Sequence, residues 1–264
     1  MKIQVLVAAM NQTDHTLLEK MNIQTSAIVG NQCDYNKVET FEYNGHDITY
    51  LSFAERGVGL NRNNALMRAT GDICLFADDD MVYVDGYADI IENAFKRLPD
   101  ADVIVFNLKE APGSSRYIID KDMKVHYLNY LRYGTARVAV KLKSVRDNGI
   151  YFNQCFGGGT EHCHGEDNIF LASCLDKKLK MYAVPEFIAE LTEERESTWN
   201  NGYDEKYLRD QGALYRAISR RLWKFLCLQD LIRHKEMYKD CNLSFFEAYR
   251  IMKNGTNNLQ NGVK

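Results

Sequence analysis

Short apolar runs separated by helical stretches constrain the fold of this chain most strongly. Continuous hydrophobicity is typical of strands that are covered on both faces, as in parallel sheets. Two stretches between the runs, residues 60–69 and 86–98, have a helical pattern, and the second ends before Pro99. The alternation predicts a Rossmann-like α/β fold, with a mostly parallel sheet and helices on both faces. The five runs cover residues 3–10, 25–31, 48–53, 72–78 and 101–108.

The rest of the chain is expected to add mixed and then helical structure. Residues 137–144 and 180–187 are interpreted as strands, and residues 168–179 as a helix after a glycine-rich loop. From about residue 204 to 252 the pattern is helical and basic. We therefore expect one large domain over residues 1–203 and a basic helical extension over residues 204–264.

Composition narrows the class of protein. The net charge of −3 among 264 residues does not indicate a nucleic-acid partner. The seven cysteines are odd in number and form no CxxC pair, which favours a reducing cytoplasm over a disulfide framework. No run approaches the roughly 20 apolar residues that span a bilayer. Residues 1–12 are interpreted as a first buried strand rather than a signal peptide.

Three consecutive aspartates, Asp78, Asp79 and Asp80, follow the apolar run at residues 72–77. If the strand continues through them, Asp78 and Asp80 point to one side and Asp79 to the other, with the outer α-carbons about 6.5 Å apart. Mg²⁺ or Mn²⁺ is commonly held by one or two carboxylates together with substrate phosphates. The alternative is a solvated acidic cap. Because ligands of α/β sheets bind beyond the carboxyl ends of the strands, the metal site is favoured.

The stretch GVGLNRNNALMRATGDICLFADDDMVY resembles the nucleotide-binding core of family 2 glycosyltransferases with the GT-A fold. In that family an Arg-Asn pair opens a helix, and a Gly-Asp pair precedes the strand that carries a D-x-D motif. The resemblance covers roughly residues 3–200. It implies an inverting enzyme of bacterial polysaccharide type, with a nucleotide-sugar-binding half at residues 1–110 and an acceptor-binding half at residues 111–203. The matching positions are Arg62, Asn63, Gly71, Asp72, Asp78 and Asp80.

The resemblance also implies individual roles. Asp80 would bind Mn²⁺ or Mg²⁺, and Asp78 would bind the ribose or complete the metal shell. Residues Ala8 to Met10 and Asn31 stand where the family often has proline and aspartate, so the choice between uracil and guanine stays open. The expected nucleotide-binding residues are Met10, Asn11, Asn31, Arg62 (near the base), Asp78, Asp79 and Trp199 (stacking on a sugar or base, or buried).

Glu166 and Asp167 follow Gly165 at the predicted start of a helix, where the macrodipole stabilises carboxylates. By itself this is a common acidic pair. It also resembles the E-D motif of the family, which implies Asp167 as the general base and Glu166 as a neighbour that orients the acceptor. The glycines at residues 157–159 would form a mobile loop over the acceptor.

The resemblance implies transfer of a sugar to a hydroxyl of a glycan or lipid-linked acceptor in surface polysaccharide synthesis. A UDP-sugar is the favoured donor. Three alternatives stay open: a metal-dependent nucleotidyltransferase, a haloacid-dehalogenase-type phosphatase with Asp78 as nucleophile, and a binding protein for nucleotide-sugars or lipid surfaces without enzymatic activity. The phosphatase motif normally ends the first strand of its core, whereas here three strand-like runs precede it.

Histidines and the basic tail leave two further questions. His162, Cys163 and His164, with Cys155 nearby, have no standard zinc spacing and are interpreted as loop residues. The family often adds a histidine to the metal site, for which His164 or His234 is available. Residues 211–239 hold seven Lys/Arg, and the pattern predicts an amphipathic helix that either touches an anionic membrane, on its cytoplasmic face, or packs on the domain. The apolar residues of that pattern are Leu214, Ile218, Leu222, Phe225 and Ile232.

Overall fold

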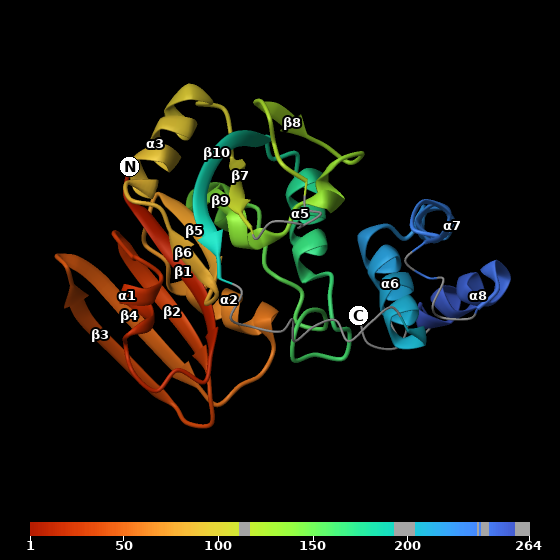
Figure 1. The fold of residues 1–264 in the computed structure, drawn as a ribbon, viewed down its shortest axis with the longest axis horizontal. Helices are drawn as coiled ribbons and strands as arrows, with labels where there is room; N and C mark the ends of the chain where they lie inside the picture. The colour runs from red at the N-terminus through yellow and green to blue at the C-terminus, as the bar shows by residue number, and fades with distance from the viewer. Residues whose placement is uncertain (111–116, 193–203, 237, 239–242, 257–264) are drawn as a thin grey trace.

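A ten-stranded mixed sheet forms the centre of the computed structural model, which describes residues 1–110, 117–192, 204–236, 238 and 243–256 (Figure 1). The strand order is β3-β4-β2-β1-β5-β9-β7-β10-β6, and β8 pairs with β10 outside this path. The strands are β1 Ile3–Met10, β2 Ser26–Gln32, β3 Lys37–Tyr43, β4 His46–Phe53, β5 Ile73–Asp78, β6 Met81–Tyr83, β7 Val103–Lys109, β8 Met123–Val125, β9 Val138–Lys141 and β10 Met181–Leu191. The helices are α1 Leu17–Lys20, α2 Val58–Arg68, α3 Tyr87–Arg97, α4 Leu142–Asp147, α5 Glu166–Asp176, α6 Glu205–Ile218, α7 Trp223–Arg233 and α8 Phe245–Gly255, with 3₁₀ turns at η1 Tyr130–Arg132 and η2 Thr135–Arg137.

Helices cover both faces of the sheet, which explains why the central strands are apolar throughout. In β5, Leu75 packs into a core shared with α1 and α3, whereas Phe76 packs into a second core shared with α2 and α5. Side chains alternate along a strand, so Asp78 falls on the same side as Phe76. The last residue of β5 therefore faces α2 and α5.

The predicted α/β sheet with helices on both faces and further helices at the C-terminal end is confirmed. The sheet is mixed rather than mostly parallel: among the described strands, four pairs are parallel and five are antiparallel. β9 is inserted antiparallel between β5 and β7, and β3 returns antiparallel to β4. β3 and β4 are joined directly by a hairpin, which makes their pairing antiparallel, whereas parallel pairs need a crossover.

The hairpin of β3 and β4 was not recognised in the sequence. Its turn is Asn44–Gly45, with φ of 50° and 80°, which matches the backbone of a two-residue hairpin turn. β3 alternates between exposed and half-buried side chains because it lies at the edge of the sheet. An Asn-Gly pair between two alternating segments was the available signal.

Two interpretations of the later sequence are corrected. The strand expected over residues 137–144 ends at Lys141, and Leu142 begins helix α4. The single amphipathic helix expected over residues 211–239 is interrupted between Ile218 and Trp223. Leu214 in α6 is buried, whereas Phe225 in α7 is 61% exposed, so the two do not belong to one apolar face.

Helices α6, α7 and α8 lie together at one end of the molecule (Figure 1) and share a small core that includes Leu208, Cys227 and Met252. α6 is capped at its N-terminus by Asp204, whose carboxylate accepts a hydrogen bond from the Tyr207 N–H at 2.8 Å. α6 and α8 approach closely at Gly212, where a Cβ atom would lie 1.9 Å from the Met252 carbonyl oxygen. The division of the chain after residue 203 stays a prediction.

Candidate active site

The three aspartates lie at the carboxyl end of β5, but they do not form one extended strand end. β5 ends at Asp78, and Asp79 and Asp80 form the turn that leads into β6. The Asp80 carbonyl oxygen accepts hydrogen bonds from Thr192 N at 2.8 Å and Thr192 Oγ1 at 3.0 Å. The turn is thereby held against the end of β10, and strict strand alternation does not extend to Asp80.

Asp79 joins the turn to the end of β1. Its Oδ2 accepts hydrogen bonds from Met10 N at 3.2 Å and Gln12 Nε2 at 3.3 Å. Asn31 is fully buried and accepts a bond from Gln12 N at 2.9 Å while donating to Gln12 O at 3.0 Å. The predicted residues Met10, Asn31 and Asp79 are therefore brought together around Gln12, which the sequence interpretation missed.

Asn11 stands at the surface of this group. It is exposed and adopts a left-handed backbone with φ of 55°, and its N–H donates to the Gln32 carbonyl oxygen at 2.9 Å. Asparagine is among the few residues that adopt this backbone readily. Trp199, the remaining predicted member, lies outside the described residues.

Arg62 of α2 connects the aspartate turn to α5. It is 3% exposed, and Nη2 donates to Asp78 Oδ1 at 2.7 Å. Nη1 donates to Glu166 Oε1 at 3.0 Å and to Asp167 Oδ1 at 2.8 Å. The carbon of the guanidinium lies 5.3 Å from the centroid of the Phe152 ring. One buried cation thus fixes three carboxylates, while contact of Arg62 with a nucleotide base stays a prediction.

Glu166 and Asp167 occupy the first turn of α5 as predicted, after Gly165 with φ of 109°. Asp167 also accepts hydrogen bonds from the backbone N–H of Thr135, at 3.1 Å, and from its hydroxyl. Asp167 is the more accessible of the pair, with 27% of its side chain exposed against 11% for Glu166. Thr135 was not singled out in the sequence, because no local pattern marks a 3₁₀ turn that reaches another helix.

Burial raises the pKa of Glu166 to about 8, and the neighbouring charge of Asp167 acts in the same direction. Arg62 opposes this shift but does not overcome it. Burial alone would lower the pKa of Arg62, yet Asp78, Asp167 and Glu166 raise it above its ordinary value. The site therefore favours the protonated form of Glu166 beside a charged Arg62.

The donor chemistry at the aspartate turn fits a hard divalent cation. Asp78 has 38% of its side chain exposed, and Arg62 binds its Oδ1 atom. Asp79 is directed to the end of β1, so the three carboxylates do not converge on one point. One or two carboxylates are what Mg²⁺ or Mn²⁺ needs when phosphates supply the other oxygens. Binding of the cation by Asp78 and Asp80 stays a prediction.

Residues His162, Cys163 and His164 contact Asp210 of α6 instead of forming a zinc site with Cys155. Within the described ranges, the group of three metal-binding side chains that converges is Cys163, His164 and Asp210, with ligand atoms within 4.8 Å of one another. Asp210 already binds His162 Nδ1 at 3.0 Å, the Cys163 N–H at 3.0 Å and Lys206 Nζ at 2.6 Å. The cluster is a hydrogen-bonded junction between the glycine loop and α6.

Both histidines considered for the metal site are engaged elsewhere. His164 Nε2 lies 2.7 Å from Gln211 Oε1, and its ring stacks on Tyr207 with centroids 4.5 Å apart. His234 Nδ1 lies 2.7 Å from Asp230 Oδ1, which raises the pKa of His234. Their role as metal ligands stays a prediction.

The glycine loop lies against both helices of the site. Val58 N donates to the Gly158 carbonyl oxygen at 3.0 Å, at the start of α2. Gly157 has φ of 102°, and a Cβ atom there would lie 2.7 Å from Glu166 Oε2. A side chain at this position would displace Glu166. The contact explains the glycine, and the predicted mobility of the loop remains untested.

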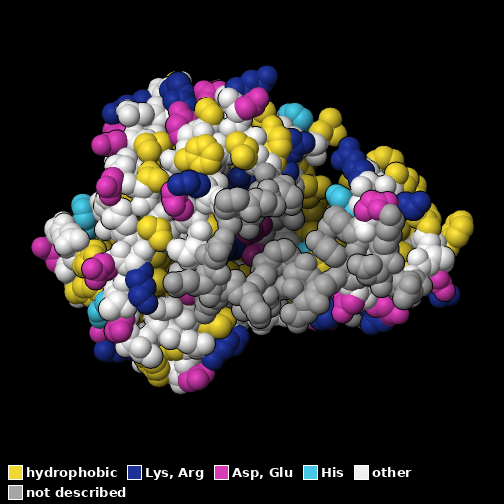
Figure 2. All heavy atoms as spheres, in the orientation of Figure 1, with side chains coloured by type: hydrophobic (Ala, Val, Ile, Leu, Met, Phe, Trp, Pro, Cys, Tyr) yellow, Lys and Arg dark blue, Asp and Glu magenta, His cyan; other side chains and the backbone are white. Residues whose placement is uncertain are grey.

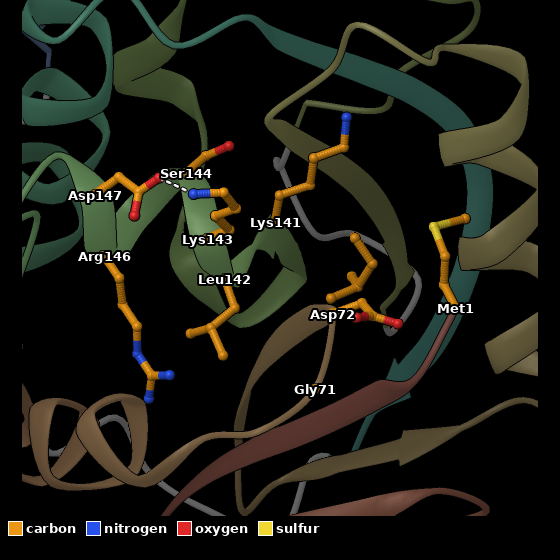
Figure 3. A pocket seen from close by; sticks show the side chains of 10 residues that line it. Met1, Gly71, Asp72, Lys141, Leu142, Lys143, Ser144, Arg146 and Asp147 are labelled. Carbon is orange, nitrogen blue, oxygen red and sulfur yellow. Dashed lines mark hydrogen bonds and ion pairs between the residues drawn. The ribbon is translucent and has the colours of Figure 1, made fainter.

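A separate cavity of about 500 Å³ lies at the opposite end of β5 (Figure 3). Its lining includes Gly71 and Asp72, which precede β5, and Lys141 and Arg146 from β9 and α4. Arg146 Nη2 donates to the carbonyl oxygens of Leu66, Met67 and Ala69, where α2 ends. These hydrogen bonds join α4 to the end of α2 beside the cavity. Figure 2 shows acidic and basic side chains inside a hollow near the centre of the view.

Comparisons with known proteins agree with this geometry. Residues 31–154 match the family model described as glycosyl transferase family 2. The fold resembles crystal structures of a 1–349 fragment of S. aureus TarS. With UDP-GlcNAc bound, the TM-score is 0.68 at 16% identity, covering 97% of this chain and 79% of the other. With UDP bound, the TM-score is 0.62 at 17% identity, covering 94% and 77%. A search of curated proteins found no match.

The fold and the family match define the class of protein. Residues 31–154 form a glycosyl transferase family 2 domain, and the chain has the GT-A fold, so the class of protein is that of a glycosyltransferase. The phosphatase alternative loses its basis, because β5 is not the first strand of the sheet and Asp78 is ion-paired to Arg62. No described helix is long and apolar enough to cross a membrane.

Proposed function

We propose that the protein is an inverting hexosyltransferase that moves a sugar from a UDP-sugar to a hydroxyl of a glycan or lipid-linked acceptor. The observation that carries the proposal is that Arg62 binds both Asp78, at the expected diphosphate side, and Asp167, at the expected acceptor side. This links the two halves of a transfer site through a single buried side chain. UDP is favoured because a TarS fragment of the same fold binds UDP-GlcNAc.

Asp167 acts as the general base. Its carboxylate is oriented by Arg62 and Thr135 and is partly exposed, so an acceptor hydroxyl can reach it. As the hydroxyl oxygen forms its bond to the anomeric carbon, Asp167 takes the proton and the bond to the diphosphate oxygen breaks. The products are the glycosylated acceptor and UDP. Glu166, held protonated by burial, orients the acceptor as a hydrogen-bond donor.

Mn²⁺ or Mg²⁺ at Asp78 and Asp80 would neutralise charge on the departing diphosphate. Asp79, with Met10 and Asn31, shapes the adjoining nucleoside pocket through Gln12. We place the enzyme in surface polysaccharide synthesis, in the cytoplasm and peripherally at the inner face of the cell membrane. Residues 1–203 form the transferase domain in this proposal.

Calorimetric titration of UDP, with GDP for comparison, tests the donor site. We expect binding of UDP that requires Mn²⁺ and that Asp80→Ala weakens at least about tenfold, because a metal ligand is lost. Asp47→Ala, an exposed aspartate on β4, is the matched control and is expected to bind as wild type. Absence of binding for both nucleotides in the presence of Mn²⁺ would contradict the proposal.

Release of UDP from UDP-GlcNAc in water, with water as the acceptor, tests the base. Asp167→Asn should lower this rate by about 10²–10⁴-fold, the usual contribution of a general base, while UDP affinity stays near that of wild type. The control is Asp176→Asn at the last residue of the same helix. An unchanged rate in Asp167→Asn would remove Asp167 from the reaction.

A further inference from the structure

Helix α7 presents an apolar stripe that no described residue covers. Phe225 is 61% exposed, Leu228 is 39% exposed and Ile232 is 64% exposed. Their spacing of three and four residues places them along one side of the helix. The opposite side is buried through Cys227, Asp230 and Leu231. These three exposed side chains are therefore not needed for the packing of α7 on α6 and α8.

Basic residues bound the apolar side chains at both ends. Arg221 lies in the turn before α7, four residues before Phe225, and Lys235 lies in the turn after α7, three residues after Ile232. We call the α7 stripe the set Arg221, Phe225, Leu228, Ile232 and Lys235. Figure 2 shows hydrophobic side chains beside Lys and Arg side chains over α7.

The charge around the stripe has one dominant sign. Of the exposed residues between positions 220 and 236, five are Lys or Arg and one, Glu236, is acidic. The other acidic residue of this segment, Asp230, is buried and binds Tyr215, His234 and Tyr238. An anionic surface is therefore the complementary partner. The five basic residues are Arg220, Arg221, Lys224, Arg233 and Lys235.

A second copy of the chain fits the stripe less well. Antiparallel packing of two α7 stripes would place Arg221 opposite Lys235 of the other copy, and parallel packing would oppose each basic residue with itself. Both arrangements bring like charges together at each end of a contact with only three apolar side chains per helix. Repulsion of that kind opposes association. A lipid surface instead accepts the apolar side chains among acyl chains and the basic ends among anionic headgroups.

We propose that the α7 stripe docks this protein on anionic lipid, with α7 lying in the plane of the membrane interface. Phe225, Leu228 and Ile232 enter the apolar boundary, while Arg221 and Lys235 bind lipid phosphates. This assigns the membrane contact to one side of α7 and leaves α6, whose Leu214 is buried, out of it. The contact does not depend on the transfer reaction, although it would bring a lipid-linked acceptor to the enzyme.

The test is co-sedimentation of the full chain with vesicles of phosphatidylcholine alone and of phosphatidylcholine with phosphatidylglycerol. We expect binding to the mixed vesicles that weakens as salt is raised. Phe225→Ser with Ile232→Ser should weaken it at least about tenfold, since each buried side chain contributes a factor of that order. Arg221→Gln with Lys235→Gln should weaken it by roughly tenfold or more.

Matched controls are Val38→Ser, an exposed apolar residue on β3, and Lys96→Gln with Lys143→Gln, exposed lysines on α3 and α4. Binding equal in the α7 variants and the wild type, or absent from mixed vesicles at low salt, overturns the proposal. So does a wild-type dimer in light scattering that Phe225→Ser with Ile232→Ser dissociates. Calorimetry with UDP on the same variants reports the donor site separately, so failure of docking is distinguishable from failure of the proposed function.

Discussion

A single arginine organises the charge of the site. Arg62 is buried, and an arginine can bind several carboxylates because its guanidinium presents five N–H donors in a fixed plane. Asp78, Glu166 and Asp167 would carry three negative charges around it if all were ionised, which burial makes unfavourable. Burial, reinforced by the neighbouring charge of Asp167, raises the pKa of Glu166 to about 8. Protonation of Glu166 leaves Asp167 as the ionised carboxylate for the proposed role of general base.

The buried Glu166 predicts a pH dependence of stability. Its pKa in the folded protein, about 8, lies above the ordinary value of 4.5, so the folded state binds more protons between these values. The free energy of unfolding therefore falls as pH rises through this window. Glu166→Gln cannot ionise, and thermal unfolding of this variant should lose less stability between about pH 5 and pH 8 than the wild type does.

The control for this measurement is Glu205→Gln. Glu205 forms an exposed pair with Arg209, with 58% of each side chain exposed, and its loss should leave the pH profile unchanged. Parallel profiles for Glu166→Gln and the wild type would show that Glu166 is already ionised at low pH in the folded state.

At the scale of elements, the site depends on where strands end and helices begin. β5 delivers Asp78, the middle of α2 delivers Arg62, and the first turn of α5 delivers Glu166 and Asp167. Gly30 of β2 lets α2 approach, since a Cβ atom there would lie 2.6 Å from Asn61 Oδ1. Small residues thus set the distance between layers.

The same kind of contact makes Gly212 a test of how α6 packs on α8. Gly212→Ala would place a Cβ atom 1.9 Å from the Met252 carbonyl oxygen, so the two helices must separate. We expect a loss of about 1–3 kcal/mol in the free energy of unfolding, despite the better helix propensity of alanine. Chemical denaturation measures it. Gly158→Ala, where a Cβ atom meets nothing within 4 Å, is the control, and equal stability of both variants would contradict the packing.

The sequence was sufficient for elements with a strong local pattern. The apolar runs predict the buried strands β1, β2, β4, β5 and β7. The pattern of Gly165 followed by two acidic residues predicts the start of α5. The partners of these residues were not predictable, because Arg62 meets Asp167 across 105 positions of the chain. The prediction of one amphipathic helix over residues 211–239 was wrong for a related reason. Hydrophobic spacing does not show that Ser219 ends α6, nor which apolar side chains face a core.

At the scale of the whole molecule, the C-terminal helices reach the site through the glycine loop. The carboxylate of Asp210 in α6 is hydrogen-bonded to the His162 ring and to the Cys163 N–H. These two residues come shortly before Gly165 and Glu166, where α5 begins. Gly165 also packs on α6, since a Cβ atom there would lie 2.7 Å from Leu214. The positions of α5 and of Asp167 therefore depend on α6, one of the C-terminal helices.

Asp210→Asn tests that dependence. Burial opposes ionisation of Asp210, but hydrogen bonds from His162, Lys206 and Cys163 lower its pKa below the ordinary range. An aspartate with a lowered pKa contributes stability above its unfolded pKa and loses it as pH falls. We expect Asp210→Asn to lose roughly 2–3 kcal/mol of unfolding free energy at neutral pH, with a smaller further loss in acid than the wild type shows. Thermal unfolding across pH measures both effects.

The same variant should also release UDP from UDP-GlcNAc more slowly, because α5 is less firmly placed, while its affinity for UDP stays near that of wild type. Affinity is spared because the aspartate turn is held by Met10 of β1, by Thr192 after β10 and by Arg62 of α2 rather than by α6. Glu205→Gln, on the same helix but outside the junction, is expected to behave as wild type in both assays. Loss of UDP affinity in Asp210→Asn, or full activity despite lower stability, would show that α6 does not act through α5.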